Sequence, residues 1–304
     1  MSAVEGGPFT FRDAVESGVS RAVVRRLVES GEWTRLRRGI YVESWRLDAG
    51  DARRVHVLRV AAALLALNFP GAVCSHESAA VLHGIALLTP PQDGVTLTRP
   101  PGAPSRDRWG DVVIRRAALP PGHVCEVDGV PVTSPARTVV DLARKLPFRA
   151  AVVSVDSALG RRTTSEAHLA AMIEACRGWR GIAAATEAVA AANPRARSPL
   201  ETLGRLMCAE AGLPSPKVGV YIGDDRSPYT EADLYWPEYG VIVLLDGVFK
   251  YNDPRTNRKE KLIQERLEND GFIVVRLTWE DITHHQARSL ERIRQAFRRS
   301  QPRP

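Results

Sequence analysis

The first apolar pattern along the chain is that of two short helices. Residues 11–17 have helical spacing, and Gly18 ends that run. Ser20 is a suitable N-cap for a second helix, because its hydroxyl can accept a hydrogen bond from the first turn. In this second helix the apolar side chains turn inward, while three cations face outward: Arg21, Arg25 and Arg26.

A basic hairpin follows the helix pair. Residues 33–36 and 40–42 have the pattern of two strands joined by a turn of Arg37, Arg38 and Gly39. Two helices separated by a tight turn and followed by a basic hairpin form the layout of a winged helix-turn-helix. The second helix is expected in the major groove, and the wing on phosphate or in the minor groove. The pattern therefore predicts a DNA interface made of Ser20, Arg21, Arg25, Arg26, Arg35, Arg37 and Arg38.

The middle of the chain mixes helices with strands. Residues 51–69 have the pattern of an apolar helix, and residues 72–88 that of a helix with His76 and His83 on one face. Three short strands and several Ala-rich helices follow, the strands at residues 95–98, 112–115 and 130–132. Because no third ligand lies near the histidines in sequence, we interpret them as packed, hydrogen-bonded side chains and expect no zinc.

A linker and a new α/β unit follow the Ala-rich helices. The linker, residues 192–199, carries two prolines, and its Ser198 caps a helix with Glu201 in the first turn. A hairpin then carries Asp233 in its first strand and Asp246 at the end of its very apolar second strand. A charged helix, a further strand and an Arg-rich helix complete the unit. This order of elements is that of the restriction-endonuclease core.

These patterns predict an α/β chain, α+β when taken as a whole, with three domains. The first is a winged helix-turn-helix over residues 1–50, and the second an α+β region over residues 51–192. The third is a restriction-endonuclease-like α/β domain over residues 193–304. A length of 304 residues agrees with more than one domain.

The charge of the chain strengthens the prediction of a DNA partner. The net charge is +7, and its 42 cations comprise 37 Arg and 5 Lys. Arg richness alone proves little, but residues 21–46 hold seven Arg against three acids, and residues 285–304 hold six against one. Clustered arginines suit a phosphate backbone.

Other features of the composition exclude several classes of protein. No apolar run reaches 18 residues and the N-terminus has no basic-then-apolar pattern, so we expect no membrane span and no signal peptide. The four cysteines lack the spacing of zinc or redox sites and are interpreted as reduced, mostly buried thiols: Cys74, Cys125, Cys176 and Cys208. These features predict a cytoplasmic location.

The N-terminal two thirds resemble a known family. GEWTRLRRGIYV, at residues 31–42, resembles the N-terminal domain of AbiEi-type antitoxins, although that family usually has another helix before the helix pair. SHESAAVLHG and PVTSPARTVVDLAR resemble the middle region of AbiEi-like proteins over residues 70–160. The resemblance implies a DNA-binding, antitoxin-like regulator, with a cognate toxin as a further partner.

Residues 197–282 resemble a second family, that of very-short-patch repair endonucleases in the PD-(D/E)XK superfamily. The matching strings are SPLETLGR, LPSP, ADLYWPEYGVIV, DGVFKY and GFIVVRLTW. The resemblance implies a Mg²⁺ site, since hard cations prefer carboxylate oxygens and phosphodiester cleavage needs charge neutralised at the phosphate. It assigns Asp233 and Asp246 to the metal, and catalysis to Glu201, Asp233, Asp246 and Lys250.

One departure from this family bears directly on catalysis. Leu244 stands where the family usually has a Glu that points into the site, and Ile263 and Gln264 replace an expected Arg and Glu, although Glu260 and Lys261 match. Three hypotheses follow. The favoured one is a DNA-binding regulator with a degenerate nuclease domain. The alternatives are an active Mg²⁺-dependent endonuclease and a protein-interaction scaffold.

Overall fold

The computed structural model describes residues 6–47, 50–92, 94–102, 107–224, 227–247 and 254–300, apart from the side chains of 254–257 and 259. The described residues form three sheets with helices between and around them, so the fold class is α+β, as the sequence predicts. None of the described helices combines the length and hydropathy that a membrane crossing requires.

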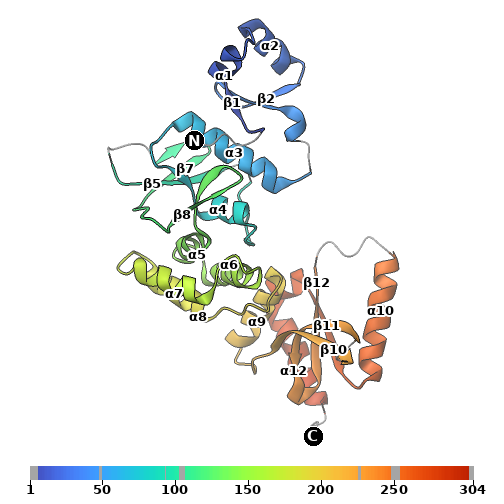
Figure 1. The fold of residues 1–304 in the computed structure, drawn as a ribbon. Helices are drawn as coiled ribbons and strands as arrows, with labels where there is room; N and C mark the ends of the chain where they lie inside the picture. The colour runs from blue at the N-terminus through green and yellow to red at the C-terminus, as the bar shows by residue number, and fades with distance from the viewer. Residues whose placement is uncertain are drawn as a thin grey trace.

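The N-terminal unit is a small sheet with a helix pair against it (Figure 1). The strand order is β1-β3-β2, and all pairings are antiparallel. The sequence predicts both helices and the β2–β3 hairpin, but not β1, which is only two residues long. The elements are β1 (Phe9–Thr10), α1 (Phe11–Glu16), α2 (Arg21–Glu29), β2 (Trp33–Arg37) and β3 (Ile40–Glu43), followed by a 3₁₀ turn (Ser44–Arg46).

The middle of the chain forms a six-stranded mixed sheet of order β6-β7-β5-β4-β9-β8. Helices α3 (Ala52–Leu67) and α4 (His76–His83) pack against it. The single helix predicted over residues 72–88 is wrong at its start, because Val73 pairs with β5 before the helix begins. The strands are β4 (Val73–Cys74), β5 (Val95–Arg99), β6 (Arg108–Trp109), β7 (Val112–Arg116), β8 (Val124–Val127) and β9 (Val130–Thr133).

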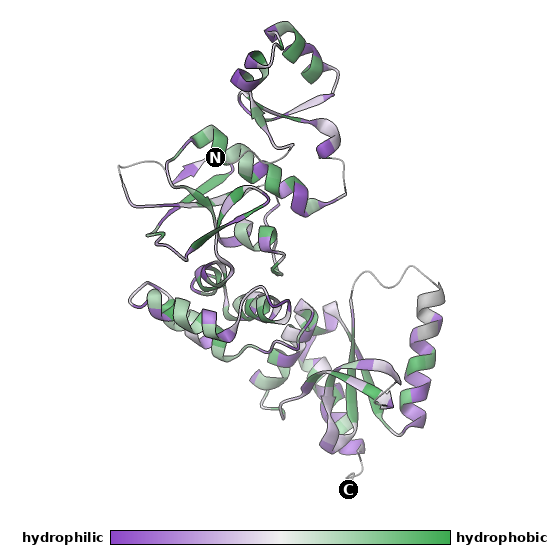
Figure 2. Cartoon of the chain, viewed as in Figure 1, coloured by the Kyte–Doolittle hydropathy of each residue, from purple (hydrophilic) through white to green (hydrophobic). Residues whose placement is uncertain are grey.

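A layer of four helices lies between the six-stranded sheet and the C-terminal sheet (Figure 1). Figure 2 shows these helices mainly in the hydrophobic colour, and their apolar side chains share one core cluster. The cluster also contains Leu206 from the following region of the chain. The helices are α5 (Pro135–Ala143), α6 (Phe148–Gly160), α7 (Glu166–Ala175) and α8 (Ile182–Ala190).

The C-terminal sheet has the order β10-β11-β12-β13, with β12 and β13 parallel and the other pairs antiparallel. Helices α9, α11 and α12 cover one face, and α10 the other (Figure 1). The sequence misses β10 and α11. The elements are α9 (Pro199–Glu210), β10 (Lys217–Asp224), β11 (Ser227–Trp236), a 3₁₀ turn (Pro237–Tyr239), β12 (Val241–Asp246), α10 (Pro254–Asn269), β13 (Ile273–Thr278), α11 (Trp279–Thr283) and α12 (Gln286–Arg299).

The segment predicted as a linker is packed against the helical layer. The buried Asp156 of α6 accepts hydrogen bonds from Asn193 N at 2.6 Å, Thr202 Oγ1 at 2.8 Å and Arg205 Nη2 at 3.0 Å. Burial raises the pKa of Asp156 above its ordinary value, although these donors oppose that shift. One carboxylate therefore fixes α6, the linker and α9 together.

Candidate nucleic-acid interface and C-terminal sheet

Helix α2 begins as the sequence predicts. The Ser20 hydroxyl accepts a hydrogen bond from Val23 N at 3.4 Å, which satisfies one of the free amides of the first turn. Val24 is buried against the small sheet, which fixes the opposite face of the helix toward solvent. Three predicted DNA contacts are exposed there, Arg21, Arg25 and Arg26.

The wing brings a further cation to the same place. Gly39, with φ of +73°, lies in the turn between β2 and β3, in a conformation that side chains rarely adopt. Arg21 and Arg25 of α2 and Arg35 of β2 line one hollow of about 470 Å³ between the helix and the hairpin. Arg35 and Arg38 are exposed. Cations from two elements therefore face a single groove-like surface.

Arg37 has a different environment from the other predicted contacts. Its guanidinium donates two hydrogen bonds of 2.8 Å to the carboxylate of Asp111, between β6 and β7, and only 18% of its side chain is exposed. Burial acts to raise the pKa of Asp111, but the hydrogen bonds and the charge of Arg37, together with the nearby backbone and Arg59, lower it below its ordinary value. Arg37 thus joins the wing to the middle sheet, a role that sequence analysis missed because its partner lies 74 residues away.

The two histidines of α4 are packed and hydrogen-bonded, as predicted. His83 Nε2 lies 2.7 Å from the carbonyl oxygen of Thr133, and His76 Nδ1 lies 3.0 Å from Ser75 Oγ. Burial lowers the pKa of both imidazoles, to about 4 for His76. The two rings therefore have different partners at opposite ends of the helix, and the absence of zinc stays a prediction. Of the four cysteines, three are buried, and Cys125 is exposed.

At the C-terminal sheet, the predicted metal ligand Asp246 forms an ion pair. Arg276 of β13 donates to its two carboxylate oxygens at 2.9 and 2.6 Å, and also to Glu260 of α10 at 2.6 Å. The hydrogen bond to Asp246 raises the pKa of the guanidinium above its ordinary value. Arg276 was not singled out from the sequence, although a lone charge in the apolar run FIVVRLTW is a signal for a buried partner.

Two of the other predicted catalytic residues, Glu201 and Asp233, also have partners within the chain. Glu201 lies in the first turn of α9, whose N-cap is Ser198; its carboxylate accepts from Arg197 N at 2.9 Å and from Ser198 Oγ at 2.8 Å, and burial raises its pKa. Asp233 Oδ2 accepts from Leu245 N at 2.6 Å, so it lies beside the end of β12. Lys250 lies outside the described residues.

Leu244 faces α10, on the same side of the sheet as Asp246. It packs against a cluster that includes Ile242 of its own strand and Leu267 of α10. Since side chains two apart on a strand share a face, this is the orientation that the sequence predicts. In the β12–β13 register Leu244 lies opposite Arg276. An acid at this position would therefore meet a guanidinium.

These donors do not fit a magnesium site. Mg²⁺ requires several oxygen ligands in near-octahedral geometry. Here Arg276 engages both oxygens of Asp246, Glu201 is held by its helix cap, and Leu244 offers no oxygen. In the part of the chain that the structure describes, no three His, Cys, Asp or Glu side chains group as metal ligands do. The guanidinium of Arg276 supplies the positive charge beside Asp246.

Two family models match the N-terminal two thirds of the chain. Residues 3–44 match a family described as a transcriptional regulator, AbiEi antitoxin, and residues 71–194 match the AbiEi antitoxin C-terminal domain. The first match contains the helix pair and the wing, and the second contains all six strands of the middle sheet and the four helices of the layer. Both lie before the C-terminal sheet.

Similar proteins come from Mycobacterium tuberculosis. The chain is 27% identical over 193 residues to two uncharacterized proteins, MT2308 of strain CDC 1551 and Rv2248 of strain H37Rv, covering 64% of this chain and 70% of theirs. The crystal structure of the RV2827C protein covers 71% of this chain and 80% of its own, at 16% identity and a TM-score of 0.42. The two family matches of the preceding paragraph, at the winged helix and at the middle region, support an antitoxin-like, DNA-binding role for the chain.

Proposed function

We propose that the chain is an antitoxin-like transcriptional regulator that binds DNA through its winged helix and does not cut it. The observation that carries the proposal is the shared hollow lined by Arg21, Arg25 and Arg35. Cations on a helix and on a wing meet a duplex at the groove and the adjoining phosphates. The partners are DNA and, as the family descriptions suggest, a cognate toxin.

In this proposal the C-terminal domain is a degenerate member of the endonuclease-like fold. The support is chemical: Arg276 already matches the carboxylates of Asp246 and Glu260, and Leu244 lies where the resembled family has an acid. The positive charge beside Asp246 is a guanidinium, which has no coordination position at which a water molecule could be activated. Metal-dependent hydrolysis requires such a position. The domain therefore contributes structure or contacts instead of chemistry.

DNA binding is tested by fluorescence anisotropy of the full-length protein with a labelled 30-base-pair duplex, across a salt series. Arg25→Ala is expected to weaken binding about tenfold, the order of a lost base or phosphate contact. Arg12→Ala is the matched control, because Arg12 forms the same kind of exposed pair, with Glu16 on α1, as Arg25 forms with Glu29. Equal affinity of wild type, Arg12→Ala and Arg25→Ala would contradict the proposal.

A further inference from the structure

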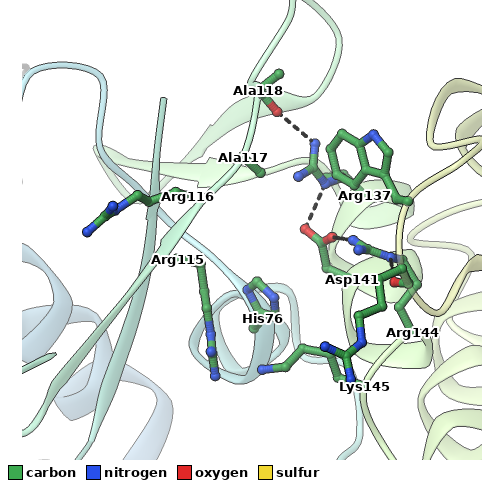
Figure 3. A pocket seen from close by; sticks show the side chains of 11 residues that line it. His76, Arg115, Arg116, Ala117, Ala118, Arg137, Asp141, Arg144 and Lys145 are labelled. Carbon is green, nitrogen blue, oxygen red and sulfur yellow. Dashed lines mark hydrogen bonds and ion pairs between the residues drawn. The ribbon is translucent and has the colours of Figure 1, made fainter. Parts of the chain in front are cut away.

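A basic cavity lies in the middle of the molecule, remote from the winged helix. Its volume is about 760 Å³, and it lies where β7, the start of α4, α5 and the turn before α8 converge. Seven of the residues that line it are charged, and only Asp141 carries a carboxylate; the six cationic residues are Arg115, Arg116, Arg137, Arg144, Lys145 and Arg180, of which Arg116 directs its side chain away from the cavity (Figure 3). The charges of this wall are therefore far from balanced.

The single carboxylate is already engaged by two of the arginines. Asp141 Oδ2 accepts from Arg137 Nε at 2.7 Å, and Oδ1 accepts from Arg144 Nη1 at 3.0 Å (Figure 3). The two guanidinium carbons lie 4.5 and 4.9 Å from the ring centre of Trp179, which fixes their planes. Two rigid arginines thus form the inner wall of the cavity.

Arg137 retains an unmatched donor at this wall. Its side chain is fully buried, and it donates to Ala118 O at 3.1 Å and contacts His123 Nδ1 at 2.8 Å. Its Nη2, however, has no hydrogen-bond partner among the described residues. A buried donor without a partner is costly, and a charged one more so, which points to a ligand that completes the set.

Two further cations stand at the mouth without partners. Within the described residues, the side chains of Arg115 and Lys145 form no hydrogen bond or ion pair, and both are exposed. In Figure 3 their charged ends point toward the same space below His76. Burial is the main cause that lowers the pKa of Lys145, and the charge of Arg115 adds to it, although the carboxylates of Glu77 and Asp141 oppose the shift.

His76 adds a neutral donor to these cations. Thr98 Oγ1 donates to Ser75 Oγ at 2.7 Å, so the Ser75 hydroxyl proton is available to His76 Nδ1, 3.0 Å away. That arrangement leaves the ring proton on Nε2. Because burial holds the pKa of His76 at about 4, the ring stays neutral near pH 7 and offers one N–H.

We propose that this cavity binds the terminal phosphoryl group of a phosphorylated ligand, with Arg137 Nη2, Arg115 and Lys145 as donors to its oxygens. A terminal phosphate carries a charge of about −1.5 to −2 and three acceptor oxygens, which suits several cations that converge from different elements. The uninterrupted backbone of a duplex presents no such end to a fully buried guanidinium. This site goes beyond DNA binding by the winged helix.

Isothermal titration calorimetry of the full-length protein, at constant ionic strength, tests the proposal with pyrophosphate. Arg115→Ala and Lys145→Ala are each expected to weaken binding about tenfold, because a charged hydrogen bond is lost. Neither side chain has a hydrogen-bond or ion-pair partner among the described residues, so both variants are expected to keep the fold. The control is Arg116→Ala, whose side chain points away from the cavity in Figure 3 and pairs with Asp107 at 2.7 Å.

The source of the phosphate is resolved with two oligonucleotides of one sequence, one 5′-phosphorylated and one 5′-hydroxylated. A preference for the phosphorylated strand that Lys145→Ala abolishes identifies nucleic-acid ends as the ligand. Equal binding of both strands beside tight pyrophosphate binding identifies a small phosphorylated molecule. If neither probe depends on Arg115 and Lys145, or Arg116→Ala weakens binding equally, the proposal is overturned. Arg25→Ala separates the two functions, because it leaves pyrophosphate binding unchanged.

Discussion

The winged helix and the C-terminal sheet both carry arginines, but the winged-helix arginines remain exposed to solvent, whereas Arg276 of the sheet is paired with carboxylates of the chain. On α2, the side chain of Arg25 is 81% exposed and that of its partner Glu29 is 63% exposed, so this ion pair is weak and Arg25 can bind a phosphate instead. On β13, Arg276 is held by Asp246 and Glu260 in a partly buried site. The number of arginines in a region therefore does not locate a ligand site. What matters is whether the folded chain already satisfies them.

The largest expected effect is on the stability of the C-terminal sheet. Arg276→Ala leaves Asp246 as a buried carboxylate without its cation and is expected to lower the free energy of unfolding by about 2 kcal/mol, after allowance for partial exposure. Arg25→Ala is expected to cost less than about 1 kcal/mol, because its pair is exposed. Urea unfolding of both variants measures the difference, and equal losses would contradict the comparison.

A smaller effect is expected where the wing meets DNA. Arg38→Ala is expected to weaken duplex binding several-fold and to lower the salt slope by about one, as the loss of a single phosphate contact does. Anisotropy titrations between low and moderate salt give both quantities. An unchanged slope would remove the wing tip from the interface.

The junction between the wing and the middle sheet gives a still smaller effect. The ion pair of Arg37 and Asp111 is partly exposed, so a double-mutant cycle of Arg37→Ala and Asp111→Ala is expected to show a coupling of about 0.5–1 kcal/mol in unfolding. If Arg37 instead contacts phosphate, Arg37→Ala weakens DNA binding while Asp111→Ala strengthens it. Parallel effects of the two single variants on binding would support the junction role.

The smallest effect is expected in cleavage. Wild type is expected to leave plasmid DNA intact with Mg²⁺ or Mn²⁺, and Leu244→Glu is expected to leave it intact as well. The introduced acid faces Arg276, and the other donors stay engaged within the fold. Agarose gels of supercoiled plasmid measure nicking. Metal-dependent cutting by Leu244→Glu, abolished by Asp233→Ala, would show that the rest of the site is intact.

Local pattern was enough to predict most of the helices and several strands. Ser20 and Ser198 mark helix starts because a hydroxyl before an amphipathic run satisfies free amides of the first turn. The orientation of Leu244 also follows from the sequence, since alternation along a strand has a fixed period. The shortest strands, such as β1 and β4, escape such reasoning, because two residues pair only when a partner strand is already placed.

The sequence by itself determined the α+β composition, the basic helix-and-hairpin unit and the set of acids that a nuclease-like domain would offer. Only the tertiary structure decided which charges remain available. Arg37 meets Asp111 across 74 residues, Asp246 meets Arg276 across 30, and α5 brings Arg137 to the wall that also holds His76. Charge pairing depends on distances in space and on exclusion of water, and neither is encoded in the spacing of residues along the chain.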